Sequence, residues 1–356
     1  MNERTRVILE ESVLPPLVAL VIVLVAGDLL IITYGQAPGT VWRVLLEGTW
    51  GNAYGFGQVL YKATTLICTG LSVAIGLRAG LFNLGAEGQL AAGGFGAALA
   101  GLALPAGTPS LIAVPVCVLA ACIFGGAVGA VPGALRAKFS AHEVIVTIML
   151  NFIVLATLNY VVSAKLHVPE TVHTPEIHAG TVPRLENIVS GFHGSAANWT
   201  IAIVALAAVA TGWFLFRTRA GYDLRAVGLQ APAAEYAGIR VGATWRRALT
   251  ISGALAGLGG INFVLGYKGY YEDGFSGGAG FLGIAVALVG RNNPLGVVLA
   301  ALFFATLSQG GLAINAMVPK QIVEVLQGIV IIAVAASVPE VRRVLRDALA
   351  GKGRSR

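Results

Sequence analysis

Ten long runs of mostly apolar residues divide this 356-residue sequence. A helix needs about 20 such residues to cross the hydrocarbon core of a bilayer. The runs lie at 13–34, 58–77, 84–104, 110–131, 143–163, 198–216, 248–267, 279–290, 295–316 and 321–338. They are continuous rather than alternating, which favours helices over a β-barrel. The sequence predicts an all-α integral membrane protein, a polytopic bundle of about ten transmembrane helices, or eight or nine if some runs are re-entrant.

The composition agrees with this prediction. Only 12% of the residues are charged, whereas soluble domains have about 25%. So few charges cannot cover a soluble surface, which excludes a soluble enzyme, a disordered regulator and a nucleic-acid binder despite a net charge of +7. We expect residues 1–356 to form a single transmembrane domain. The cysteines lie inside apolar runs, so we expect them to act as small hydrophobic residues without a disulfide.

The basic residues predict an orientation. With ten spans and the N-terminus inside, the inner segments carry 18 of the 24 Lys and Arg residues, as the positive-inside rule requires. Both termini are then cytoplasmic, and residues 339–356 form a basic cytoplasmic tail. Residues 164–197 form a long extracytoplasmic loop and residues 217–247 a cytoplasmic loop. The first run is too long for a signal peptide and is predicted to be retained.

Polar residues accompany a cluster of glycines at 76–94, which predicts either a broken helix or close helix packing. Asn83 and Glu87 are four residues apart and would share one face of a helix. With Phe82 and Gln89 they could bind a polar, planar solute. The alternative is that Glu87 caps a helix N-terminus or pairs with Arg78.

Other polar side chains fall inside predicted spans. Asn151 lies four residues after Thr147, so the two either line a pathway or form interhelical hydrogen bonds. Asp28 lies in the first run without an obvious partner. The histidines of loop 164–197 have no ligand spacing and are predicted to be solvated.

A short helix is predicted in the cytoplasmic loop, because Pro232 suits a first helical turn and Gly238 suits a C-terminal stop. Such a helix would fit a groove in a partner protein, or it would lie on the lipid surface. The sequence contains no P-loop, so any ATP that drives the protein is hydrolysed by another chain.

Four segments carry a family resemblance. They read GLRAGLFNLGAEGQLAAGGF at 76–95, EVIVTIMLN at 143–151, LRAVGLQAPAAEYAGIRV at 224–241 and GFLGIAVALVGRNNPLGVV at 280–298. In these segments the sequence resembles the permease subunits of bacterial ABC importers in the branched-chain amino acid, ribose and nucleoside group. It is most similar to the nucleoside permeases, which work with basic-membrane-protein-type lipoprotein binding proteins.

The resemblance implies a type II-like ABC importer permease in the bacterial inner membrane. Its partners would be an ABC ATPase subunit, a second copy or a paralogous permease, and a periplasmic or lipoprotein substrate-binding protein. The loops at 164–197 and 268–279 would face the binding protein. This chain would bind no cofactor, since ATP and Mg²⁺ would be used by the ATPase.

The resemblance also assigns roles to residues. The coupling helix that contacts the ATPase would consist of Pro232, Ala234, Glu235, Tyr236, Ala237 and Gly238. From their polar or aromatic character within the membrane, we expect the substrate pathway to include Phe82, Asn83, Glu87, Gln89 and Asn151. A small polar solute, most of all a nucleoside, would be imported by alternating access. The alternatives are a simple sugar or a branched-chain amino acid as substrate and, more distantly, an ion-coupled secondary transporter.

Overall fold

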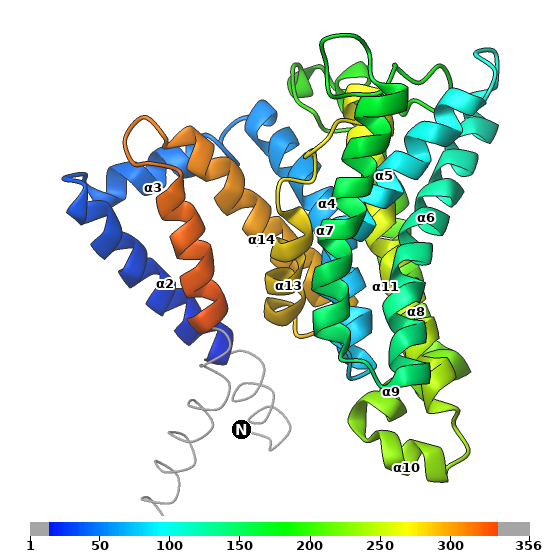
Figure 1. Cartoon of the computed structure of the whole chain (residues 1–356). Coiled ribbons are helices and arrows are strands. Elements are labelled where there is room, and N and C mark those ends of the chain that lie inside the picture. The colour runs from blue at the N-terminus through cyan, green and yellow to red at the C-terminus, as the bar shows by residue number, and fades with distance from the viewer. Residues whose placement is uncertain (1–13, 334–356) are drawn as a thin grey trace, which may run out of the picture. The chain divides into compact units, whose positions relative to one another are not determined.

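The computed structural model describes residues 14–333 (Figure 1), and these residues divide into two compact units. The larger unit spans Ala53–Ala305. The smaller unit consists of the chain segments that precede and follow this range. The main helices are α2 (Leu14–Thr33), α3 (Pro38–Glu47), α4 (Ala53–Arg78), α5 (Ala86–Ala103), α6 (Ser110–Phe139), α7 (Glu143–Val161), α8 (Thr200–Arg217), α9 (Arg219–Leu229), α10 (Ala231–Tyr236), α11 (Val241–Gly259), α13 (Ala279–Val289) and α14 (Pro294–Ala313).

Helices α4, α5 and α11 form the centre of the larger unit (Figure 1). Helix α11 packs against α4, α5 and α6, and α13 packs against α4. Side chains of α4 and α11 are mostly buried, whereas α7 buries only 17% of its most apolar window. Helices α6, α7 and α8 turn large apolar side chains outward, such as Leu111, Phe152 and Leu206. Exposing so much apolar surface to water is energetically unfavourable. These helices therefore suit a lipid environment or contact with a partner chain.

Each of the ten predicted runs contains a helix within the described residues. Six helical segments are long and apolar enough to cross a membrane, or seven if the pair Val21–Thr33 and Pro38–Glu47 forms one span. The six are Ala53–Arg78, Ser110–Phe139, Glu143–Leu166, Thr200–Arg217, Val241–Lys268 and Pro294–Ala313. Helices α13 and Gln321–Ala333 are shorter. A polytopic, all-helical architecture is therefore observed. The count of ten spans stays a prediction, and the basic tail at 339–356 lies outside the described residues.

The smaller unit shows a helix that the hydropathy pattern did not predict. Helix α3 follows α2 after a bend of 110°. The Trp42 indole on α3 donates a hydrogen bond of 2.7 Å to the Asp28 carboxylate on α2. Asp28 therefore has a protein partner, which explains how a carboxylate is tolerated within an apolar run.

An aromatic cluster lies where α5 meets the segment after α11. Tyr271 is fully buried, and its ring makes edge contacts with Phe95 and Phe275 at centroid distances of 5.4 and 5.5 Å. Its backbone bonds to Thr174, so the cluster joins loop 164–197 to the segment after Lys268. Burial raises the pKa of the Tyr271 phenol. The hydroxyl has no hydrogen-bond partner among the described residues.

Replacing Tyr271 with Phe should therefore keep or raise stability. The substitution preserves the ring contacts and removes a buried hydroxyl that lacks a partner, a group that costs about 1–3 kcal/mol when unsatisfied. The apparent Tm of the purified protein should be unchanged or higher. Tyr160→Phe, at an exposed position of α7, is the matched control and should have no effect. A clear fall in Tm for Tyr271→Phe alone would show that the hydroxyl has a partner.

Candidate functional site

The helix breaks where the glycines and polar residues cluster. Helix α4 ends at Arg78 and α5 begins at Ala86, and the residues between them are not helical. Gly80 has a φ of +72°, and a Cβ there would lie 3.3 Å from the Gly228 backbone. A break between α4 and α5 is therefore observed, and so is close helix packing, because a Cβ on Gly93 would lie 2.2 Å from the Gly257 Cα. Because Asn83 lies in the break, it does not share a helical face with Glu87.

Asn83 forms the centre of a buried polar network. Its amide nitrogen donates to the Ser252 hydroxyl at 2.7 Å, to Gln89 Oε1 at 2.8 Å and to the Ser72 hydroxyl at 3.1 Å. Its amide oxygen accepts from the Gly85 backbone and from Gln89 Nε2. Asn83 and Gln89 are both fully buried. The network therefore ties the break to α4 and α11, which contribute Ser72 and Ser252.

Asn151 of α7 bonds to the segment that contains the break and the start of α5. Its amide donates to the Leu84 carbonyl at 2.8 Å and accepts from the Gly88 backbone amide at 2.9 Å. Gly88 lies in the first turn of α5, where backbone amides lack helical partners. Asn151 thus satisfies one of these amides and fixes the start of α5 to α7.

Glu87 caps a helix, but not the one on which it lies. Its carboxylate accepts from the Gly280 amide at 2.7 Å, the Gly278 amide at 3.0 Å and the Ser276 hydroxyl. These donors lie at the N-terminus of α13, where a negative charge is favoured. Glu87 is 5% exposed. The expected pairing with Arg78 is wrong, because Arg78 Nε donates to the Asn292 carbonyl at 2.9 Å.

The polar residues of the predicted pathway thus lie close together around the break between α4 and α5. Phe82 is 37% exposed, while Asn83, Glu87, Gln89 and Asn151 are buried. Their role in substrate passage stays a prediction. Three serines that complete these contacts were not predicted from the sequence: Ser72, Ser252 and Ser276. Single serines in glycine-rich segments give no local signal, since serine is also a common packing residue in membrane helices.

A second buried polar cluster joins α8 to α4. The Asn262 amide donates to the Tyr61 carbonyl at 2.8 Å and to the Thr65 hydroxyl at 3.0 Å. Its oxygen accepts from Asn198 Nδ2 at 3.0 Å and from the Thr200 hydroxyl. Because these bonds join segments far apart in the sequence, Asn262 acts as an interhelical link.

The short helix predicted after Pro232 is present. Helix α10 spans Ala231–Tyr236, and Gly238 follows it with a φ of +84°. Ala234 packs inward, but the Tyr236 side chain is 94% exposed, and Leu229 at the end of α9 is 89% exposed. Tyr236 and Leu229 are thus the most exposed large apolar side chains of the α9–α10 hairpin, ahead of Tyr222 on α9, as expected of a surface that docks to a partner.

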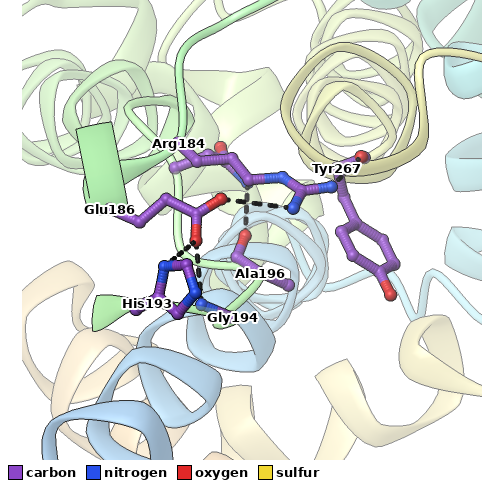
Figure 2. Close-up of polar contacts among 7 residues, drawn as sticks. Arg184, Glu186, His193, Gly194, Ala196 and Tyr267 are labelled. Atoms are coloured by element: carbon purple, nitrogen blue, oxygen red, sulfur yellow. Dashed lines mark hydrogen bonds and ion pairs between the residues drawn. The ribbon is translucent and has the colours of Figure 1, made fainter. Parts of the chain in front are cut away.

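Figure 2 shows a charged group in the loop after α7. The Glu186 carboxylate accepts from the Gly194 backbone amide at 2.8 Å and lies 3.4 Å from Arg184 Nη1. His193 Nδ1 lies 3.8 Å from the same carboxylate, and Arg184 also donates to the Tyr267 carbonyl. The Gly194 hydrogen bond and the Arg184 charge hold the pKa of Glu186 below its usual range.

The order of this loop should depend on pH. A carboxyl group with a depressed pKa stabilises the folded loop above its usual pKa, and this contribution is lost as the pH falls through the folded value. Limited proteolysis within 164–197 should therefore be slow at neutral pH and faster under acidic conditions. Glu186→Gln should be cleaved faster at neutral pH, with little further change on acidification. Glu176→Gln, at an exposed position of the same loop, is the control and should behave as wild type. Equal cleavage of Glu186→Gln and wild type at neutral pH would contradict this role.

Comparison with known proteins identifies the family of the chain. A family model described as branched-chain amino acid transport system / permease component matches residues 55–335. The guanosine ABC transporter permease protein NupP of Bacillus subtilis is 38% identical over 91% of this chain and 93% of its own. The nucleoside ABC transporter permease protein NupB of Lactococcus lactis is 34% identical over 94% of this chain and 92% of its own.

The glucose ABC transporter permease protein TsgB13 of Haloferax volcanii is 33% identical over 89% of this chain and 85% of its own. No solved structure gives a significant match. The family model covers most of the chain, and these three relatives align with nearly all of it. The chain therefore belongs to the branched-chain amino acid transport system permease family.

Proposed function

We propose that this chain is the membrane-spanning subunit of an ABC importer that carries nucleosides into a bacterial cell. The observation that carries the proposal is the similarity to two permeases whose names specify guanosine and nucleosides. Each aligns with more than nine tenths of this chain. The segments that resemble nucleoside permeases include the break between α4 and α5 and the end of 143–151, where Asn151 bonds to Leu84 and Gly88.

In the proposed arrangement the chain crosses the bacterial inner membrane ten times, with both termini in the cytoplasm. The α9–α10 hairpin then lies on the cytoplasmic side, where a separate ABC ATPase binds ATP and Mg²⁺. Loops 164–197 and 268–279 face a substrate-binding protein outside. A second permease chain, identical or paralogous, completes the pathway.

The proposed mechanism is alternating access. Closure of the ATPase dimer moves α10, and α9 transmits the movement, because the Gly228 position lies directly against the Arg78 carbonyl at the end of α4. The break that follows α4 contains the predicted pathway residues Phe82 and Asn83. Stacking of a base on Phe82 would contribute about 1–3 kcal/mol. Such weak binding allows release, so selectivity would lie mainly in the binding protein.

Uptake of labelled guanosine, adenosine and cytidine tests this function. Cells that lack the gene should lose ATP-dependent uptake, and the gene on a plasmid should restore it. Excess unlabelled ribose, glucose or leucine should not compete. A matched strain with an inactive partner ATPase should also fail to take up nucleosides, which an ion-coupled transporter would not require. Unchanged nucleoside uptake in the deletion strain would overturn the proposal.

Glucose is a second candidate substrate, because a relative named for glucose transport is nearly as similar as the nucleoside permeases. A branched-chain amino acid is a third, from the description of the family. Loss of labelled glucose or leucine uptake in the deletion strain, with nucleoside uptake intact, would favour one of these and retain the permease assignment.

Tyr236→Ala tests the docking surface on α10. Truncation of a tyrosine that serves as a hot spot of an interface costs about 2 kcal/mol or more. We expect uptake to fall about tenfold or more while the amount of permease in the membrane stays the same. Tyr222→Ala, at a position that is 61% exposed on α9, is the control and should transport normally. Normal uptake by Tyr236→Ala would exclude this side chain from the ATPase contact.

A further inference from the structure

An apolar groove runs along the surface of the larger unit. Helices α4, α8 and the first half of α14 form its walls, and its volume is about 630 Å³. Leu60, Ala205 and Val298 are typical of its lining, and Asn293 is its one polar residue. The groove extends from Ile201 to Phe216 along α8, which corresponds to about 22 Å at 1.5 Å per residue. That length suits an extended hydrocarbon chain.

One end of the groove is positively charged. The ring of Phe216, which lines this end, has two guanidinium groups close to it, with Arg225 at 5.3 Å and Arg78 at 5.9 Å from its centroid. Arg78 Nε donates to the Asn292 carbonyl, next to the groove residue Asn293. Arg225 forms no hydrogen bond to the described residues, and its Nε is buried without an acceptor.

Within residues 14–333, no carboxylate oxygen lies within 4.0 Å of Arg78 or Arg225. Ion pairs among these residues are formed by Arg43, Arg136, Arg184 and His193. The N-terminus of α14, at Pro294, lies at the same end of the groove and adds the partial positive charge of a helix dipole. A half-buried guanidinium without an acceptor favours a ligand with anionic oxygens.

We propose that this groove binds a phospholipid with an anionic headgroup. The phosphate and headgroup lie against Arg225 and Arg78, and one acyl chain lies in the groove between α8 and α14. The charged end and the apolar walls match the two parts of such a lipid, and basic pockets between membrane helices attract anionic headgroups. A nucleoside does not fit, because the walls offer its hydroxyl groups a single polar side chain, Asn293.

The purified complex in detergent, with phosphatidylglycerol or phosphatidylcholine added, tests the proposal. A lipid that binds the folded state raises the apparent Tm. Phosphatidylglycerol should raise the Tm of the wild type more than phosphatidylcholine does. Arg225→Gln and Ala205→Leu should each reduce this difference by half or more, the first by removing the charge and the second by filling the groove.

Two matched variants control for charge and for size. Arg240→Gln removes an exposed arginine outside the groove, and Ala210→Leu enlarges an exposed alanine of α8 that does not line it. Both should keep the wild-type difference. Ala205 and Ala210 are exposed, so neither leucine disturbs the core.

Three outcomes would overturn the proposal. The first is an equal response of all variants to phosphatidylglycerol. The second is an equal stabilisation by inorganic phosphate, which would indicate a free anion rather than a lipid. The third is a disulfide between two Ala205→Cys chains in native membranes, which would place a second permease over the groove. None of these measurements uses uptake, so the result does not depend on the identity of the transported solute.

Discussion

Replacing Glu87 with alanine should lower the free energy of unfolding by about 3 kcal/mol or more. The carboxylate accepts hydrogen bonds from Ser276, Gly278 and Gly280, and it is almost completely buried. Each buried donor left without an acceptor costs about 1–3 kcal/mol, and bonds to a charged group are at the upper end. The N-terminus of α13 also loses the negative charge that lies against it. The yield and the apparent Tm of the purified complex should both fall clearly.

Two further variants make this prediction specific. Glu235→Ala removes an exposed carboxylate from α10 and should leave the Tm unchanged. Ser276→Ala removes one of the three donors, so its effect should be smaller and should not add to that of Glu87→Ala. If Glu87→Ala keeps the wild-type Tm but abolishes uptake, Glu87 acts on the substrate rather than on the position of α13.

The helices could be predicted because hydropathy is a local property of the sequence. Each predicted run contains a helix, and the glycines at 76–94 mark the observed break. Helix α3 was missed because Arg43 and Glu47 interrupt its apolar pattern, and these two side chains pair with each other on its exposed face.

The contacts of the polar residues could not be predicted, because they join distant segments. Glu87 meets donors almost 200 positions later in the sequence, and Asn83 meets Ser252 across a similar separation. Several helix ends lie close to any one carboxylate in a folded bundle. The rule that acidic residues favour helix N-termini therefore identified a capping role for Glu87 but not which helix it caps.

Gly257→Ala should strongly destabilise the centre of the larger unit, because a single added methyl group would meet backbone atoms of α6. Helix α11 passes α6 and α5 in direct backbone contact at this position. A Cβ on Gly257 would lie 2.5 Å from the Ala121 carbonyl oxygen and 2.9 Å from the Gly125 Cα of α6. On the α5 side, a Cβ on Gly93 would lie 2.2 Å from the Gly257 Cα. Added volume in a tight core costs about 1–3 kcal/mol, and more where the neighbours cannot move.

Backbone atoms on two helices cannot yield as the end of a flexible side chain does, so α11 must separate from α6 to admit the methyl group. We expect a loss of about 3 kcal/mol, with little monodisperse protein in size-exclusion chromatography and a clearly lower apparent Tm. Gly212→Ala is the matched control, because its nearest non-local atoms, on Pro294, lie 3.9 Å from the new Cβ. In a helix interior alanine is favoured over glycine by up to about 1 kcal/mol. The same substitution should therefore stabilise α8 and disrupt α11, and a wild-type Tm for Gly257→Ala would show that α11 does not pack this closely against α6.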